Sequence, residues 1–283
     1  MAIKCILLPV SGYEADESAL VAALGLAKSL GAFVEAIHVK PDPREAVPLV
    51  AEGAAGSVVA QMIDLAEKES AGRADHAQRL FESAAKKAGV ALSGPSAGAR
   101  FATAVGRAAD EIAVRARVAD LTVVVRITGE ALVEWNVTVE AALMEGGRPL
   151  LILPAGLKAW SAATVALGWN GSAEAARAAA ASLPLLAPAR RVILLAGVKE
   201  IPVEPSLSQL ADWLAHHGIK AETRKIALKG WPVEGEIVDE ARAAGAELLV
   251  MGAYGHSRMR EVVFGGATRA VLDDAGIPVL LMH

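Results

Sequence analysis

Short apolar runs alternate with alanine-rich stretches along the whole chain. Each run has the length of a β-strand, and the stretches between runs have the pattern of helices. Strands that alternate with helices form βαβ units around a parallel sheet, so the pattern predicts an α/β fold. Helices are predicted at Glu14–Leu30, Ala173–Leu186 and Val233–Ala244. The predicted strands are Ile3–Pro9, Phe33–Val39, Gly98–Phe101, Asp120–Val125 and Pro149–Leu153 in the first half, and Thr164–Trp169, Arg191–Gly197, Ala221–Ala227, Glu247–Gly252 and Pro278–Met282 in the second.

The two sets of strands match, which indicates an internal duplication. Gly147–Leu153 (GRPLLIL) resembles Gly276–Met282 (GIPVLLM), and Ala119–Leu121 resembles Ala246–Leu248. A chain of 283 residues is long enough for two domains. We expect these at residues 1–155 and 162–283, joined by Ala155–Ala163. The last strands of the halves should pair or lie close in an intramolecular pseudo-dimer, because pairing hides strand edges.

The halves differ by an extra segment, roughly Asp42–Ser70, in the first. It opens with Pro41, Pro43 and Pro48, and its pattern becomes helical through about Lys87. One interpretation is a surface excursion followed by a long crossover helix, since long surface loops are tolerated. The other is a lid or a surface for a partner.

Charge and cysteine content exclude several classes of protein. Charged residues make up 21% of the chain, the net charge is −4, and both signs are interspersed. This excludes a basic surface for nucleic acid or membranes. The sequence has no leader pattern and no apolar run long enough to span a membrane. Cys5 is the single cysteine, so no internal disulfide can form; we expect it to be a small core residue in a cytoplasmic protein.

The chemistry of the chain is concentrated in one glycine pattern, Gly252-x2-Gly255-x9-Gly265-Gly266. Gly252 ends a predicted strand, and Gly265 and Gly266 precede a predicted helix at Ala267–Ala275. Ligands of open α/β sheets bind beyond the carboxyl ends of strands, where glycines allow close backbone approach. Successive amides at a loop and a helix start form a cradle for phosphate. The alternative is a strand exit and a helix start that each need glycine for purely structural reasons.

This pattern is similar to the nucleotide-binding signature of ATP-binding universal stress proteins. The flanking Tyr254–Arg258 and Ile277–Leu280 also resemble that family, and the likeness extends over the chain as two copies. The resemblance implies two tandem Rossmann-like domains of the adenine nucleotide alpha hydrolase type. Each would be a five-stranded parallel sheet of order 3-2-1-4-5 between helices. It also implies a role in the stress response and an adenine nucleotide, ATP or a relative, with Mg²⁺ as its companion ion.

The resemblance places the nucleotide site in the second half. Asn170 stands where the family carries an Asp that contacts adenosine; its alternative role is to start the turn and cap the next helix. Gly266 stands where the family has Ser or Thr, and Thr268 matches a further contact. The implied binding residues are Gly168, Trp169, Asn170, Val198, Met251, Gly252, Tyr254, Gly255, Gly265, Gly266, Ala267 and Thr268.

The first half departs from the family pattern, so we expect it to be degenerate. Ser11 stands at the Asp position, and Gly129 has no partner glycine at the x9 spacing. We expect Arg126 at the position of Gly252, where its side chain would fill the cradle. Gly146 and Gly147 follow a predicted helix and should end it.

Other functions find little support in the residues. Ser11–Ser18 lacks the second glycine and the Asp spacing of the loop in ATP pyrophosphatases. The chain has no P-loop and no dinucleotide-binding motif, and His216-His217 do not share a helical face. We therefore expect no catalytic residues, no protein-bound metal and at most very slow ATP hydrolysis. The alternative is a scaffold that binds no nucleotide and acts through protein partners and dimerisation, including a homodimer.

Overall fold

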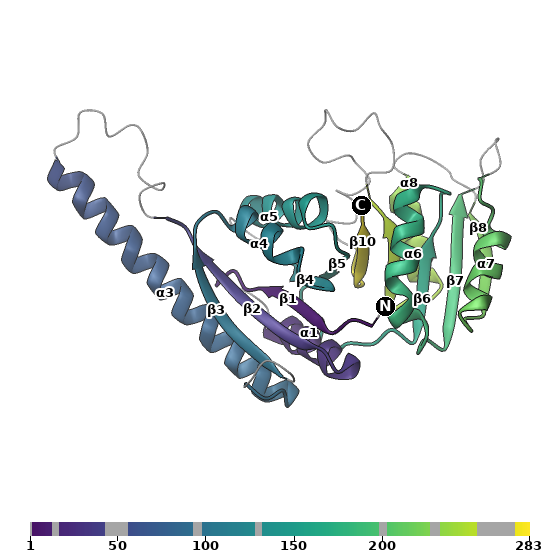
Figure 1. Ribbon diagram of the computed structural model, residues 1–283, viewed down its shortest axis with the longest axis horizontal. Coiled ribbons are helices and arrows are strands. Elements are labelled where there is room, and N and C mark those ends of the chain that lie inside the picture. Colours follow the sequence, from purple (N-terminus) through teal and green to yellow (C-terminus); the bar gives the residue numbers. More distant parts are fainter. Residues whose placement is uncertain are drawn as a thin grey trace. The chain divides into compact units, whose positions relative to one another are not determined.

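The chain divides into two compact units, each described here by itself (Figure 1). The N-terminal unit consists of Lys4–Gly147 with Ala155–Ala159. The C-terminal unit consists of Trp160–His283 with Arg148–Pro154 and the start of the chain. The structure is a computed structural model that describes residues 2–12, 17–42, 56–92, 98–127, 132–197, 203–226, 233–253 and 275–283.

The described strands of the N-terminal unit form a parallel sheet in the order β3-β2-β1-β4. Helices α1 and α3 pack together on one side of it, and α4 and α5 pack together on the other (Figure 1). The strands are β1 (Cys5–Pro9), β2 (Phe33–Lys40), β3 (Ala99–Val105) and β4 (Leu121–Val125). The helices are α1 (Glu17–Leu30), α3 (Gly56–Ala88), α4 (Ala108–Ala116) and α5 (Leu132–Glu145).

The C-terminal unit contains the sheet order expected for each half. Its parallel strands follow the order β8-β7-β6-β9-β10, which is 3-2-1-4-5 counted along the second half. The strands are β6 (Thr164–Gly168), β7 (Arg191–Gly197), β8 (Ala221–Ile226), β9 (Leu248–Gly252) and β10 (Val279–Met282). The helices are α6 (Ala173–Leu186), α7 (Leu207–His216) and α8 (Val233–Ala243).

The last strand of the first half, β5 (Leu150–Leu153), belongs to the C-terminal unit. It runs antiparallel to β10, with Leu151 opposite Leu280. The expected pairing of the last strands is therefore confirmed. The strict count of five strands per domain is not met, because this pairing gives β5 to the sheet of the C-terminal unit. Both leucines are fully buried, so the pairing covers apolar side chains as well as an edge.

Apolar strands and small helix residues build the core of each unit. Every residue of β4 and of β5 is buried. Strands buried on both faces are typical of parallel sheets under helices, where an alternating pattern is not needed. Helix α1 buries several alanines with Leu20, Leu24 and Leu26, and small side chains let a helix approach a sheet closely. Cys5 departs from its expected place in the core: it is half-buried, and this burial raises the pKa of its thiol.

The duplication extends to equivalent side-chain contacts. In the N-terminal unit the Asp120 carboxylate accepts hydrogen bonds from the amides of Lys4 and Cys5, at 2.8 and 2.9 Å. In the C-terminal unit the Glu247 carboxylate accepts from Ala163 and Thr164, at 2.6 and 3.1 Å. Each carboxylate thus holds the start of the first strand of its half against the start of the fourth. The sequence match at these positions reflects a shared structural role.

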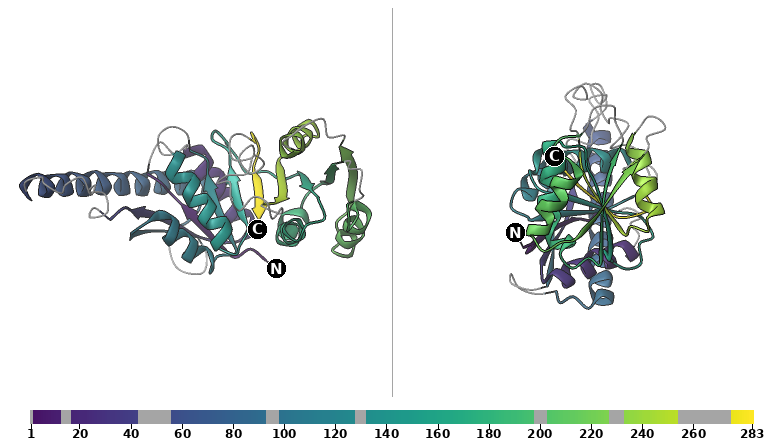
Figure 2. Two further views of the ribbon diagram at one scale, coloured as in Figure 1. Left: turned by 90° about the horizontal axis from the view of Figure 1, so that it is seen from above. Right: turned by 90° about the vertical axis from the view of Figure 1, so that its right-hand side faces the viewer.

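Helix α3 follows the extra segment of the first half, of which residues 43–55 lie outside the described residues. Ala77, Phe81 and Ala84 are completely buried toward its C-terminal end, where α3 packs against α1. Toward its N-terminal end α3 extends past β2 and β3, and Met62 and Leu65 are exposed (Figure 1; Figure 2, left). The long crossover helix is confirmed for residues 56–88. The role as a lid or partner surface stays a prediction.

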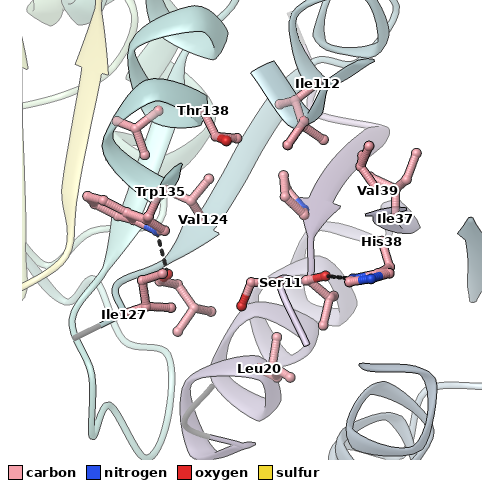
Figure 3. A pocket seen from close by; sticks show the side chains of 15 residues that line it. Ser11, Leu20, Ile37, His38, Val39, Ile112, Val124, Ile127, Trp135 and Thr138 are labelled. Carbon is pink, nitrogen blue, oxygen red and sulfur yellow. Dashed lines mark hydrogen bonds between the residues drawn. The ribbon is translucent and has the colours of Figure 1, made fainter. Parts of the chain in front are cut away.

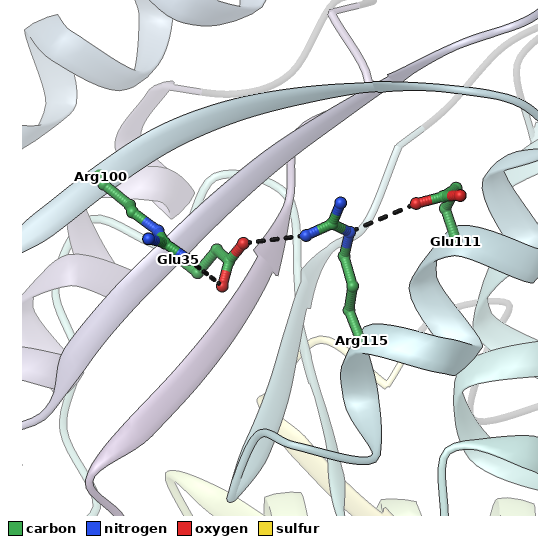
Figure 4. Close-up of polar contacts among 4 residues, drawn as sticks. All are labelled: Glu35, Arg100, Glu111 and Arg115. Atoms are coloured by element: carbon green, nitrogen blue, oxygen red, sulfur yellow. Dashed lines mark hydrogen bonds and ion pairs between the residues drawn. The ribbon is translucent and has the colours of Figure 1, made fainter. Parts of the chain in front are cut away.

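A charged cluster ties α4 to β2 and β3 in the N-terminal unit (Figure 4). Glu35 of β2 accepts from Arg100 of β3 at 3.0 Å and from Arg115 of α4 at 3.1 Å. Arg115 also pairs with Glu111, one turn earlier in α4, at 3.4 Å. The Glu35 carboxylate bridges two cations, so it links three elements of the unit.

Within the described ranges, no helix has the length and apolar character needed to cross a membrane.

Candidate functional site

The carboxyl ends of β6 and β9 lie side by side in the C-terminal unit. Leu167 of β6 is level with Val250 of β9, so Gly168 ends next to Met251 and Gly252. A Cβ placed on Gly168 would lie 3.6 Å from the Cβ of Met251. The structure thus brings together three of the predicted binding residues. They lie at a switch point, where the strand order reverses and where ligands of such sheets bind.

Trp169 follows β6 and lies in the core. Its amide donates to Leu195 of β7 at 2.8 Å, and its indole Nε1 donates to the carbonyl of Pro205 at 2.7 Å. The residue is 5% exposed. Its indole N–H is used within the protein, so its contribution to a ligand would come from the ring surface or the backbone.

Asn170 is exposed and shapes the turn after β6. Its Oδ1 accepts from the amide of Ser172 at 3.0 Å, the hydrogen bond of an Asx-turn. The cap of α6 is Ser172, whose Oγ accepts from the amide of Ala175 at 3.2 Å. Of the structural roles predicted for Asn170, the turn is confirmed and the helix cap is wrong. The chain needs two more residues after Asn170, including Gly171 at φ 75°, to turn into the helix.

Gly252 is covered by the first turn of α6. A Cβ at this position would lie 2.5 Å from the amide nitrogen of Ala175 and 2.7 Å from the carbonyl carbon of Glu174. These are backbone atoms, so they cannot move aside without shifting α6. Among the described residues, therefore, it is the close packing of α6 that requires a glycine at position 252.

The rest of the predicted phosphate cradle lies outside the described residues, and its geometry stays a prediction. In the described part of the chain, His, Cys, Asp and Glu side chains form no group that could hold a metal ion. The predicted residues concerned are Val198, Tyr254, Gly255, Gly265, Gly266, Ala267 and Thr268.

The same edge in the N-terminal unit can be aligned by strand register. Ile6 of β1 pairs with Leu121 of β4, as Val165 of β6 pairs with Leu248 of β9. Leu121 and Leu248 are therefore equivalent, and four residues further along their strands Val125 is equivalent to Gly252. Arg126 falls one residue later, so its predicted equivalence to Gly252 is wrong. Its guanidinium carbon lies 5.9 Å from the centre of the Trp135 ring.

A pocket of about 700 Å³, counting its open mouth, lies at this edge of the N-terminal unit (Figure 3). Leu20, Ile37, Ile112 and Val124 are among its lining residues, and Arg126 is not. The sequence predicted a filled, degenerate copy in the first half, so this pocket was not expected. The signal for it was the wholly apolar end of the fourth strand, Leu121–Val125, with Ile127 and Trp135 shortly after.

Two aromatic rings in the wall of the pocket are held by backbone carbonyls. The Nε1 of Trp135 donates to Val125 at 2.9 Å, and Nδ1 of His38 lies 2.8 Å from the carbonyl oxygen of Val10. Because a carbonyl only accepts, Nδ1 of His38 carries the proton in this contact. Both rings are nearly inaccessible, at 7% and 3% exposure, so their orientation is set by the fold.

Comparison with known proteins supports both the architecture and a family. Residues 194–283 match the Universal stress protein family. A universal stress protein from Archaeoglobus fulgidus DSM 4304 is 15% identical, with 98% of this chain and 95% of that chain covered and a TM-score of 0.71. A protein of unknown function from Pseudomonas aeruginosa PAO1 is 14% identical, with 99% and 92% covered and a TM-score of 0.57. At these identities the likeness shows the fold over both halves.

A universal stress protein solved in complex with cAMP is 28% identical, with 44% of this chain and 98% of that chain covered and a TM-score of 0.36. No curated protein sequence matches the chain.

Proposed function

We propose that the C-terminal half, whose residues 194–283 match the Universal stress protein family, binds one adenine nucleotide. The observation that carries the proposal is the spacing Gly252-x2-Gly255-x9-Gly265, which lies within the matched residues. This spacing is similar to the nucleotide-binding signature of the ATP-binding members.

The described part of the site supports the proposal by its position. Gly252 ends β9, and the amide of Ala253 donates to Met282 of β10 at 2.9 Å. The loop that carries the other glycines therefore leaves the sheet at its carboxyl edge, beside the end of β6. Oriented backbone amides at such an edge attract anions, and a polyphosphate is the anion that a glycine-rich loop accommodates best.

The proposed activity is binding with at most very slow turnover. Backbone amides stabilise a phosphate group but do not take a proton from an attacking water. Among the described residues, no carboxylate group converges that could hold Mg²⁺, so we assign the ion no protein ligand and no step. The function would then be that of a stress-response protein whose state depends on whether a nucleotide is bound.

Isothermal titration with ATP tests the proposal. We expect one site per chain in the wild type and no detectable site after Gly265→Val, because a branched side chain would hold the phosphates away from the amides. Gly235→Val is the matched control: Gly235 lies in α8, where an added Cβ meets nothing within 4 Å. Thermal unfolding without ligand checks that both variants fold.

A ligand at 100 times its dissociation constant should stabilise the wild type by about 2.7 kcal/mol. Two equivalent sites per chain, or undiminished affinity after Gly265→Val, would show that the site is elsewhere. A wild type that binds no adenine nucleotide would favour the alternative function, a scaffold that acts through protein partners.

A further inference from the structure

We propose that the N-terminal unit binds a second kind of ligand, a small uncharged molecule with an apolar ring body and one hydrogen-bonding group. The site is the pocket at the carboxyl ends of β1, β2 and β4. This goes beyond the nucleotide site proposed for the other half, and it rests on a different set of residues.

The position of the pocket favours a ligand site over a packing defect. It lies where β1 and β4 are neighbours and the chain turns to opposite sides of the sheet, the place at which open α/β sheets bind ligands. Residues from three strand ends and from α1, α4 and α5 line it, so one hollow collects side chains from six elements.

The walls of the pocket are preformed. Figure 3 shows Trp135 and Ile127 on one side and Ile37, His38 and Val39 on the other. Trp135 and His38 are each hydrogen-bonded to a backbone carbonyl, and Ile112 and Val124 are at most 3% exposed. Rigid walls lose little conformational entropy when a ligand binds, which favours affinity.

The lining chemistry selects an uncharged, mainly apolar ligand. Among the described lining residues there is no Lys, Arg, Asp or Glu; the polar side chains are Ser11, His38 and Thr138. A phosphate or carboxylate placed here would lose its hydration without a cation to replace it. The apolar walls instead gain from removing a ring from water, and a serine or threonine hydroxyl, which has one donor and two acceptor sites, can pair with a single polar group beside its existing partner.

The strand register and the glycine positions of the first half, compared with those of the second, argue against a second nucleotide in the N-terminal unit. The apolar fourth strand ends in Val125 at the position that Gly252 holds in the other half, and Gly129 has no partner glycine at the x9 spacing of the phosphate-binding pattern. The guanidinium of Arg126 lies over the Trp135 ring. The strand-end position that is a glycine in the C-terminal unit is thus an apolar valine in the N-terminal unit, next to an apolar pocket.

Titration with 2-naphthol, an uncharged bicyclic ring with one hydroxyl, tests the proposal on the full chain. We expect one site per chain in the wild type. Thr138→Trp should fill the pocket and raise the dissociation constant about tenfold or more. Val137→Trp is the matched control, since Val137 is the preceding residue of α5 and is 45% exposed. It should bind as the wild type does, and ATP binding should be the same in all three proteins.

A second pair of variants covers the case in which Thr138→Trp does not fold. Ala108→Phe enters the pocket from α4, and Val114→Phe, on the exposed side of the same helix, is its control. Absence of 2-naphthol binding to the wild type, or equal affinity in the folded pocket variants and their controls, would overturn the proposal. So would a second ATP site per chain that Ala108→Phe removes, because this would give the pocket to a nucleotide.

Discussion

Equivalent carboxylate residues make equivalent hydrogen bonds at the strand starts of the two halves. Asp120 and Glu247 differ by one methylene, yet each accepts two amide hydrogen bonds at the start of its first strand. Satisfying amides that would otherwise lack a partner at a strand start stabilises the sheet, and a carboxylate is a strong acceptor for them. Gly168 and Gly252, in contrast, end neighbouring strands but face different neighbours.

This difference between the two glycines gives a prediction. Gly252→Ala should lower the free energy of unfolding by about 1–3 kcal/mol, because its new Cβ would overlap the backbone of α6. Gly168→Ala should be tolerated, since its nearest neighbour would be a methyl carbon of Ile237 at 3.4 Å. Urea denaturation of both variants measures the difference. Equal stability of the two would show that α6 adjusts freely at Gly252.

The contact of Gly252 with α6 makes this residue a poor choice for testing the nucleotide site. If Gly252→Ala destabilises α6, a loss of ATP binding in that variant would not identify a ligand contact. Gly265→Val is therefore the more informative change, provided that its thermal unfolding matches that of the wild type.

At the scale of elements, Glu35 connects β2, β3 and α4. Its carboxylate side chain is 17% exposed and lies between Arg100 and Arg115. The Glu35 carboxylate is partly buried and accepts from two cations. It therefore stays in position when one contact breaks, whereas an isolated surface ion pair does not. The cluster therefore fixes the end of α4 over the sheet, on the side that also carries the pocket wall at Ile112.

We predict that Glu35→Gln lowers the free energy of unfolding by about 1 kcal/mol and that added salt reduces the difference from the wild type. Asp64→Asn is the control. It removes the Lys68–Asp64 pair of α3, whose side chains are 73% and 65% exposed, and should leave stability unchanged. Urea denaturation at low and high salt measures both. An equal effect of the two substitutions would mean that the cluster adds nothing beyond a surface ion pair.

At the scale of the molecule, the main feature is that β5 covers the edge of β10. The strand comes from the first half of the chain but pairs with β10, where it covers an otherwise open edge. An open parallel sheet that ends in an apolar strand such as Val279–Met282 would offer its backbone groups to other chains. The duplication thus supplies each chain with its own partner for this edge.

Two fragments test this role of β5. Residues 147–283 keep β5 with all strands of the C-terminal unit, and we expect this fragment to be monomeric. Residues 160–283 lack β5, and we expect them to associate as concentration rises, because β10 would pair with β10 of another copy. Analytical ultracentrifugation compares the two. The same sedimentation for both fragments at every concentration would show that β5 does not protect the edge.

The sequence by itself determined the repeating pattern of the fold. All ten predicted strands are present, most within one or two residues of their expected ends, and the pairing of the last strands follows the prediction. It also located the helix stop at Gly147, which has φ 62°. The strand positions and the helix stop depend on local periodicity and on glycine chemistry, so they can be derived from neighbouring residues. The pairing of the last strands is not local, and it was inferred from the duplication and from the need to cover strand edges.

Tertiary structure alone decided what lies at the strand ends. In contrast, the position of Arg126, one residue beyond the equivalent of Gly252, already follows from the match of Ala119–Leu121 to Ala246–Leu248, and the strand registers agree with it. The helix over Gly252, the cap at Ser172 in place of Asn170 and the apolar pocket around Trp135 each join residues that are brought together by the turn of a helix onto a sheet. Such contacts are set by distances between elements. A one-residue shift of register moves a side chain from one position to the next, and the linear pattern of apolar and polar residues hardly changes.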